Sequence, residues 1–535
     1  MPLLSSSLHD VLLLAGAPLL GIAHYKWFAA VQQTVSEPYL DEAFHIPQAD
    51  AYLMGNWTHW DDKITTPPGL YLCSIAATKL ASLVHSQADS SSINLRWTNF
   101  ALSYLLVLVC IVWRRTASSS IPRRGSIITQ ELYVLAFPLM FFFSALYYTD
   151  IFAAFTVMCT YIAWQMGANV KGRTKVMLQI LHFTTGTISL TARQTNIFWS
   201  AIFLGGLQLI QTVKLTTRIH DPPIADTYFE DIPLTTISLV SSAFENIPRL
   251  LFDLWPQLAL LAEFATFVAW NGGVVLGDKS NHIAGVHFAQ MLYLWPFLLF
   301  FSWPVTLPQL AHVTQLSNRR PRIWLATVVL LVIFGIVHFN TIIHPFLLAD
   351  NRHYTFYVFK LLRSSAWLWY AAVPVYAVSA WLSIHALASK MSFSGGPGVK
   401  DSKRRRLSTS SGPGDVVKLE ADSNRTSFVL VWFLSTALSL ISAPLVEPRY
   451  FLIPWLIWRL HVPDSSDVLK DSEDVAAKDV HLSQRIEKIM MLVARNSVLI
   501  EVAWYMTINF VTCRLFLYTR FEWPHEPGIT QRFMW

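Results

Sequence analysis

Titratable side chains gather in the segment EPYLDEAFHIPQ, residues 37 to 48, directly after the first long apolar run of the chain. Asp41 and His45 are four residues apart and Glu42 is three residues from His45, so a helix here would place these groups on one face. Pro47 is expected to end that helix early. Carboxylates at the edge of an apolar region are expected to have raised pKa values, which favour a general base. The alternative interpretation is a solvated loop without chemistry.

A second polar segment, GNWTHWDDKITTPPGLY at residues 55 to 71, follows in the same loop. Its tryptophans and its tyrosine are typical of anchors at a membrane interface. Lys63 precedes a rigid Pro-Pro-Gly turn that would fix its position. Because a lysine at an interface is a point-charge ligand for phosphate, this segment favours an anion-binding role.

The composition indicates which elements must position these residues. Of the 535 residues, 53% are hydrophobic and 14% are charged, whereas soluble domains carry about 25% charged residues. The mean hydropathy is +0.40. Apolar runs such as residues 11–30 and 323–343 are long enough, at ~1.5 Å per residue, to cross a ~30 Å hydrocarbon core. The sequence therefore predicts an all-α polytopic membrane protein, and its first run is expected to be a retained anchor.

Several other classes of protein are excluded by spacing. The formal charge of +6 is divided among short loops and forms no continuous basic face for nucleic acid. No P-loop, dinucleotide-binding fingerprint or nucleophile elbow is present, and no histidine set has zinc-ligand spacing. The cysteines lie in apolar segments without paired or metal-type spacing, at Cys73, Cys110, Cys159 and Cys513.

Lysine and arginine accumulate on one side of the predicted spans, as expected for loops that face the cytosol. Roughly 12 to 14 membrane helices are predicted, including a shorter candidate at residues 450–461. The other predicted spans are residues 11–30, 97–113, 132–148, 151–168, 176–192, 197–213, 257–276, 287–304, 323–343, 366–388, 427–445 and 497–518.

Successive loops alternate between the two sides of the membrane, and all basic clusters face the cytosol only if residues 67–84 do not cross it. These residues are therefore predicted to form an interfacial helix within the first luminal loop, residues 32–96. The alternative, a true span, would put the basic cluster after residue 113 on the opposite side. The whole chain, residues 1–535, is then one membrane-embedded domain. Its large cytosolic loops are predicted at residues 214–256, at residues 390–426, which are basic and disordered, and at residues 462–489, which are charged.

Further polar residues emerge on the same side as residues 37–48, including Arg193 and the segments at residues 277–287, 344–357 and 447–450. An arginine on the side that positive-inside sorting depletes is a functional candidate, because an anion or a carboxylate must hold it. Structural ion pairs within the segments, between Asp350 and Arg352 or between Glu447 and Arg449, are the alternative.

Four segments together, EPYLDEAFHIPQ, WDDKITTPPGLYL, ADNRHYTFYVF and LVEPRYFLIPW, resemble a known family. It is the endoplasmic-reticulum family of dolichyl-phosphate-glucose-dependent α-1,2-glucosyltransferases. The resemblance implies a GT-C-type membrane fold with interfacial helices in the first luminal loop and an active site facing the lumen. It also implies inverting transfer of glucose from dolichyl-phosphate-glucose to a diglucosylated dolichyl-pyrophosphate oligosaccharide, before N-glycosylation.

The implied reaction needs one carboxylate to take the proton of the acceptor hydroxyl, and cations to stabilise the leaving phosphate. The family motif matches Asp41 as the base, with Glu42 as the alternative. Neither a metal nor a cofactor is required by this scheme. Residues expected to bind the donor phosphate are Lys63, Arg352, His353 and Arg449. Residues expected to bind the acceptor or support the site are Glu37, His45, Asp61, Tyr354 and Glu447.

Two alternative functions stay open on the sequence alone. Another transferase of the same fold, using a different dolichyl-phosphate sugar, would need the same base. A membrane transporter or channel-associated protein would instead place Asp41, Arg193 and Arg352 along a permeation path near the bilayer midplane.

Overall fold

The computed structural model describes residues 6–84, 92–117, 131–168, 170–279, 285–310, 323–343, 345–388, 424–443, 445–463, 482–524 and 526–535. Within these residues the fold is helical, apart from one antiparallel hairpin of β1 (Arg520–Trp523) and β2 (Glu526–Arg532). The predicted class, an all-α polytopic membrane protein, is confirmed.

The helices of the first half begin with α1 (Ser6–Thr34), α2 (Glu42–Leu53), α3 (Gly69–Val84), α4 (Ser92–Ala117), α6 (Leu132–Ala136), α7 (Pro138–Phe143), α8 (Thr149–Ala168) and α9 (Gly172–Ala192). Then follow η1 (Gln194–Asn196), the π-helix η2 (Phe198–Phe203), α10 (Leu204–Lys214), η3 (Ile224–Asp226), α11 (Asp231–Glu245), α12 (Ile247–Asp253) and α13 (Trp255–Asn271).

The helices of the second half are α14 (Phe288–Phe301), α15 (Trp303–Thr306), α17 (Ile323–Phe339), α18 (Pro345–Ala349), α19 (Tyr354–Arg363), α20 (Ala366–His385), α23 (Thr426–Ile441), η4 (Pro448–Phe451), α24 (Leu452–His461), α25 (Leu482–Arg495) and α26 (Ser497–Tyr518).

In the described part of the chain, five helices are long and apolar enough to cross a membrane, and six if the bent pair α12 and α13 forms one span. Several other predicted spans form shorter apolar helices, including α14, α17 and α23. The predicted total of roughly 12 to 14 membrane helices for the whole chain stays a prediction.

One predicted span, residues 132–148, is not a single continuous helix. It divides into the short helices α6 and α7, because Phe137 adopts an extended conformation with φ −54° and ψ 127°. The ring of Pro138 disfavours helical geometry at the residue before it and removes a backbone donor. The two short helices are nonetheless buried at the centre of the molecule.

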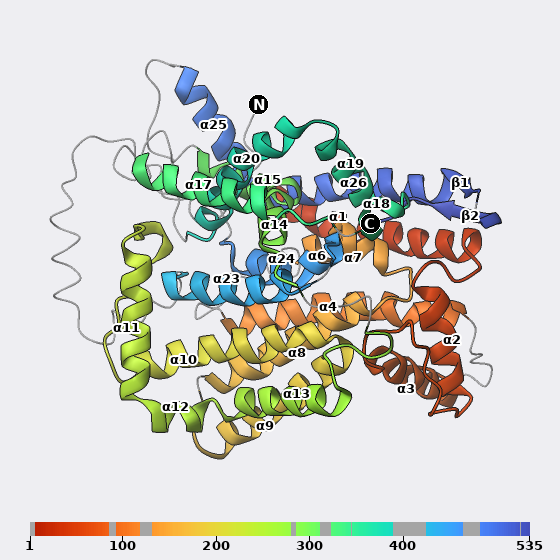
Figure 1. The fold of residues 1–535 in the computed structure, drawn as a ribbon, viewed down its shortest axis with the longest axis horizontal. Helices are drawn as coiled ribbons and strands as arrows, with labels where there is room; N and C mark the ends of the chain where they lie inside the picture. The colour runs from red at the N-terminus through yellow and green to blue at the C-terminus, as the bar shows by residue number, and fades with distance from the viewer. Residues whose placement is uncertain are drawn as a thin grey trace.

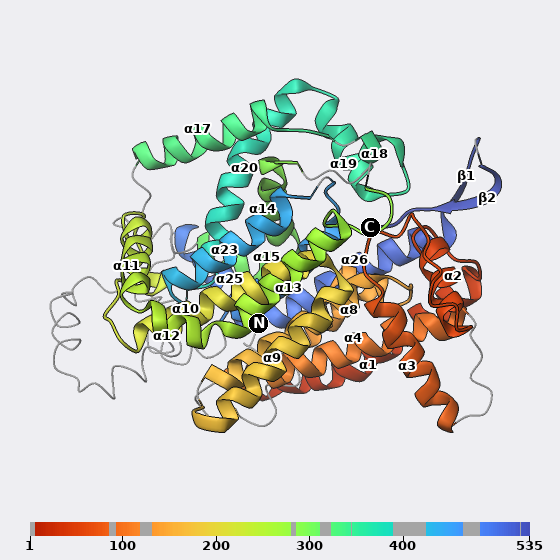
Figure 2. The same ribbon diagram turned by 60° about the horizontal axis from the view of Figure 1, so that its bottom comes forward.

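Helices α4, α8 and α10 lie along the longest axis of the molecule, with α2 and α3 at one end and α11 and α12 at the other (Figure 1). These are called the α2 end and the α11 end. Figure 2 shows α17 and α20 on the side of the molecule away from α4 and α9. Helix α9 has 21 residues and so spans ~31 Å, which matches a hydrocarbon core.

Two of the predicted cytosolic loops contain helices of their own. Residues 214–256 contain α11 and α12. The predicted disordered segment 390–426 lies outside the described residues except at its last three positions. In the predicted loop 462–489, residues 482–489 belong to α25, while residues 464–481 are not described. The predicted interfacial helix at residues 67–84 is the helix α3.

Helix α24 is packed in the buried core of the molecule. Phe137 stacks on Trp455 with 3.5 Å between ring centroids, and Arg459 forms an ion pair with Glu501 at 2.7 Å, with both side chains almost fully buried. Helix α24, which holds Trp455 and Arg459, follows directly after Arg449. A buried helix therefore fixes the segment that presents this arginine.

Candidate active site

The turn before α2 has an unusual backbone. Leu40 has φ +54°, the one positive φ at a non-glycine residue in the described part of the chain. The Glu42 carboxylate accepts a hydrogen bond from the backbone N–H of Tyr39 at 3.1 Å and so closes the first turn. Helix α2 continues through Pro47 to Leu53, contrary to the prediction that Pro47 ends it. A proline inside a helix removes one backbone hydrogen bond and commonly kinks the helix, but here the helix continues beyond it.

Glu42 is fully engaged by buried partners. Arg96 donates two hydrogen bonds to its carboxylate, from Nε to Oε1 at 2.8 Å and from Nη2 to Oε2 at 2.6 Å, and both side chains are 0% exposed. The backbone N–H of Tyr147 donates to Oε1 at 2.6 Å. Each carboxylate oxygen therefore already accepts two hydrogen bonds. Glu42 joins the first loop to α4 and to the turn before α8.

Asp41 is held differently. Its Oδ2 lies 2.7 Å from Nη1 of Arg449, while its side chain remains 41% exposed. The Tyr148 hydroxyl accepts a hydrogen bond from its backbone N–H at 3.3 Å. Burial acts to raise the pKa of Asp41, but the guanidinium of Arg449 outweighs it and holds the pKa below its usual value. The predicted rise in carboxylate pKa is therefore wrong for Asp41.

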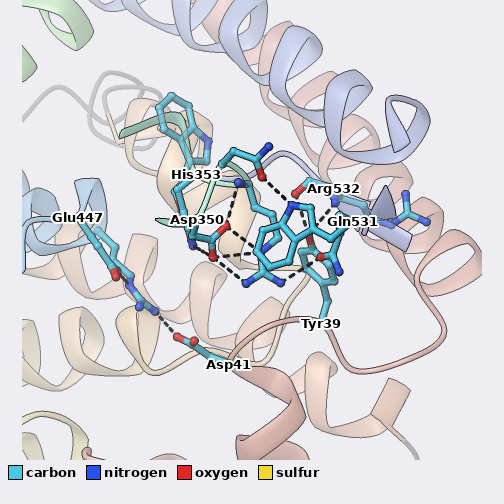
Figure 3. Close-up of polar contacts among 12 residues, drawn as sticks. Tyr39, Asp41, Asp350, His353, Glu447, Gln531 and Arg532 are labelled. Carbon is cyan, nitrogen blue, oxygen red and sulfur yellow. Dashed lines mark hydrogen bonds and ion pairs between the residues drawn. The ribbon is translucent and has the colours of Figure 1, made fainter. Parts of the chain in front are cut away.

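Arg449 belongs to a network of alternating charges. Its Nε contacts Glu447 and its Nη1 contacts Asp41. The labelled side chains of Asp41 and Glu447 are drawn in Figure 3. The Nη1 of Arg449 also lies 3.8 Å from Asp150, whose side chain is 2% exposed. Arg193 approaches Asp150 from the end of α9, at 3.0 Å, and donates to the hydroxyl of Thr149 at 3.2 Å. Two arginines thus lie on either side of one buried carboxylate beside Asp41.

His45 is buried one turn after Asp41. Its Nδ1 and the hydroxyl of Tyr71 form a hydrogen bond of 2.6 Å, which joins α2 to α3. Burial lowers the pKa of His45 to about 4, although nearby Asp41 acts to raise it. The imidazole is therefore neutral at neutral pH, and its geometry is that of a support rather than a cation.

A second polar cluster includes Asp350 and His353, which lie above Asp41 in the view of Figure 3. Arg352 makes a bidentate contact with Asp350, at 2.7 and 2.9 Å, and stacks over Trp523 at 4.3 Å. His353 lies 3.7 Å from the same carboxylate, and its Nδ1 bonds to the carbonyl of Trp535 at 2.9 Å. The alternative of a structural ion pair is thus realised both for Arg352 with Asp350 and for Arg449 with Glu447.

The four cations predicted to bind phosphate do not all converge. Arg449 contacts Asp41, whereas Arg352 and His353 contact Asp350. Lys63 is exposed and lies 4.9 Å from the ring of Phe44. The sequence left open which of these cations converge, and phosphate binding by any of them stays a prediction.

The remaining predicted support residues are dispersed. The Asp61 carboxylate accepts from the backbone N–H of Lys63 at 2.9 Å and so shapes the turn. Glu37 is exposed, and its carbonyl accepts from Arg96 at 3.3 Å. Tyr354 packs edge-on against Trp535, and its buried hydroxyl has no hydrogen-bond partner in the described part of the chain.

Sequence analysis missed three contributors to the site: Arg96, Asp150 and the segment Gln531–Trp535. Arg96 and Asp150 are single charges at the ends of apolar runs, where an ionisable side chain is costly unless it is paired. That signal could have identified both residues. The segment 531–535 carried no such signal, since half of its hydrogen bonds use its backbone atoms and the guanidinium of Arg532 binds backbone carbonyls elsewhere in the chain.

Helices that can cross a membrane, together with a partly exposed carboxylate held by arginine at one end of them, are consistent with a polytopic membrane glycosyltransferase. The chain belongs to the DIE2/ALG10 family, which matches it over residues 35–460. The resemblance noted from the sequence is confirmed.

Relatives from distant organisms cover nearly the whole chain. The Dol-P-Glc:Glc(2)Man(9)GlcNAc(2)-PP-Dol alpha-1,2-glucosyltransferase of Aspergillus fumigatus is 37% identical over 95% of this chain and 96% of its own length. The enzymes of the same name from Emericella nidulans and Homo sapiens are 36% and 33% identical, each over 95% of this chain and over 96% and 95% of their own lengths. No solved structure matches the chain.

Proposed function

We propose that this chain transfers glucose from dolichyl-phosphate-glucose to a diglucosylated dolichyl-pyrophosphate oligosaccharide, with formation of an α-1,2 linkage. The names of its relatives support this donor, acceptor and linkage, since they match nearly the whole chain. They do not favour a transporter or a transferase of another sugar.

The observation that carries the proposal is the difference between two adjacent carboxylates. Asp41 is 41% exposed and pairs through one oxygen with Arg449, whereas Glu42 is buried and accepts four hydrogen bonds. A general base must reach the proton that it removes. Asp41 is therefore the proposed base, and Glu42 a structural anchor.

The proposed reaction is a single displacement at the anomeric carbon of the donor. The acceptor 2-hydroxyl oxygen attacks that carbon and its proton passes to an Asp41 oxygen, while the bond to the phosphate oxygen breaks with its electron pair. Dolichyl phosphate leaves as an anion, so cationic stabilisation replaces a second carboxylic acid. Neither a metal nor a cofactor is needed in this scheme.

Arg449 is the proposed first ligand of the donor phosphate, with Arg193 beside it. Both guanidiniums are partly exposed, at 14% and 16%. An arriving phosphate would compete with Asp41 for Arg449, because both are anions of similar hydrogen-bonding geometry. Loss of that partner would raise the pKa of Asp41 and make it a stronger base when the donor is bound. Lys63, His353 and Arg352 remain candidates for ligands of more distant groups.

The proposed orientation places the α2 end in the lumen of the endoplasmic reticulum. Lys175 and Lys214 bind Asp253 and Asp221, near α12 and in the segment before α11, at the end opposite Asp41. Basic residues mark cytosolic loops. A glycosylation tag inserted within residues 398–414 should accordingly remain unmodified, and its modification would contradict this orientation.

The activity is tested with the purified protein in liposomes, given dolichyl-phosphate-glucose and the diglucosylated lipid-linked oligosaccharide. We expect the product to gain one hexose in an α-1,2 linkage, and dolichyl-phosphate-mannose to give no product. Transfer of mannose would assign the chain to another reaction of the same kind. Movement of lipid without transfer would support a transporter.

A further inference from the structure

The segment Gln531–Trp535 contacts both Tyr39, in the turn before Asp41, and the loop that carries Arg352. We propose that it is a clamp that holds the Tyr39–Asp41 turn, and with it the carboxylate of Asp41, in the conformation used for transfer. The proposal rests on the role assigned above to Asp41. It names Tyr39 and Arg532 as positioning residues.

Arg532 joins the ends of two helices. Its guanidinium donates to the carbonyls of Phe516 and Leu517, in the last turn of α26, at 2.9 and 3.0 Å. It also donates to the carbonyl of Thr34, the last residue of α1, at 3.1 Å. Carbonyls at helix ends lack partners within the helix, and a cation there is favoured by the helix dipole. The Arg532 side chain, which is 4% exposed, thus fixes the position of β2 relative to both helices.

Tyr39 binds the backbone of the same arginine twice. Its hydroxyl donates to the Arg532 carbonyl at 2.7 Å and lies 2.8 Å from the Arg532 backbone N–H, which donates to it. Burial raises the pKa of Tyr39 to about 12, so the hydroxyl remains protonated and able to donate. These two hydrogen bonds attach the residue two positions before Asp41 to the clamp.

Leu40 explains why such an attachment is needed. Its φ of +54° lies in the left-handed region, which is strained for a non-glycine residue and persists only where surrounding contacts hold it. On one side of Leu40, Tyr39 is held by Arg532, and on the other the Asp41 backbone N–H donates to Tyr148. Strain at a turn directly before the proposed base is a mark of a constrained site.

The other end of the segment holds the second polar cluster. Met534 donates to the carbonyl of Arg352 at 2.9 Å and accepts from the backbone N–H of Tyr354 at 3.1 Å. The Trp535 carbonyl bonds to His353. The same segment therefore contacts both the Tyr39 turn and the loop that carries Arg352 and His353.

The test compares Tyr39→Phe and Arg532→Gln with wild type, with Tyr518→Phe at an exposed tyrosine as the matched control. The kcat and the KM for each substrate are measured per mole of monodisperse protein. We expect Tyr39→Phe to lower kcat about tenfold or more with KM within about twofold, since small displacements of reacting groups carry penalties of this size or larger. Unchanged kcat per folded molecule in both variants, with only the yield reduced, would overturn the proposal.

Leu40→Gly supplies a second arm. Glycine adopts a positive φ without strain, so it should make the turn less dependent on the clamp. We therefore expect Tyr39→Phe to reduce kcat less in a Leu40→Gly background than in wild type. Equal losses in both backgrounds would contradict the strain argument. Full activity of Asp41→Asn would remove the base assignment itself, whereas an inactive Asp41→Asn with normal Tyr39→Phe would remove only the clamp.

Discussion

Asp41 and Arg449 are 408 positions apart in the chain and form an ion pair of 2.7 Å at the α2 end of the membrane helices. The guanidinium lowers the pKa of Asp41, the proposed base. In the proposed mechanism the same guanidinium binds the donor phosphate, so one arginine would link proton transfer to departure of the leaving group. The predictions below separate this role from those of the neighbouring residues.

Arg449→Gln should move the acid limb of the pH–rate profile upward. Arg449 holds the pKa of Asp41 below its usual value, so in wild type the ionised base is lost only when the pH falls through that low pKa. In the variant, burial remains without the cation, and the loss begins at higher pH. We also expect kcat/KM to fall about 10²-fold or more at neutral pH, through lost stabilisation of the phosphate. The measurement is kcat/KM for transfer between pH 4 and 8.

Arg363→Gln, which changes an exposed arginine in α19, is the matched control and should behave as wild type. An acid limb at the same pH in Arg449→Gln and wild type would show that Arg449 does not set the pKa of the base.

Glu42→Gln should act on stability. The substitution leaves the buried charge of Arg96 unpaired, which costs about 3–5 kcal/mol. Thermal melting in detergent should therefore show a large fall for Glu42→Gln and a partial recovery for the double variant Glu42→Gln/Arg96→Met. A Glu42→Gln protein that melts like wild type but does not transfer glucose would make Glu42 the base.

His45 should make the folded protein less stable in mild acid. Its pKa is lowered to about 4 in the folded state against about 6.5 when unfolded, so the unfolded chain binds the extra proton first. The contribution of His45 is fully present above pH 6.5 and is lost as the pH falls toward 4. Melting temperatures at pH 7.5 and 5 should differ less for His45→Asn than for wild type. An equal or larger difference in the variant would contradict the assignment.

The sequence indicates the position of the proposed base, but it does not indicate the direction of that residue's pKa shift. Asp41 stands out as part of an acidic motif directly after a span. The direction of its pKa shift depends on Arg449, which only the tertiary fold brings near. The same holds for Glu42, whose partner Arg96 is 54 positions away. The local sequence pattern therefore indicates these two residues as candidates, but it does not predict the pKa of Asp41 or the ion pair of Glu42.

The fold, too, could be predicted from the sequence only in part. Helices are present at almost all of the predicted spans. An apolar run favours a helix because a helix satisfies the hydrogen bonds of its own backbone. The break at Phe137 is caused by Pro138, which is present in the sequence. The break was not predicted, because Pro138 lies within a long apolar run. The contacts of Arg532 with the ends of α1 and α26 could not be foreseen, since backbone carbonyls carry no sequence signal.

The central claim is tested most directly by the transfer rate of Asp41→Asn. Asparagine keeps the size of the side chain and its place beside Arg449 but cannot accept the proton. The account predicts folded protein that still binds dolichyl-phosphate-glucose, with kcat reduced about 10²–10⁴-fold, the usual contribution of a general base. A kcat within about threefold of wild type would contradict it.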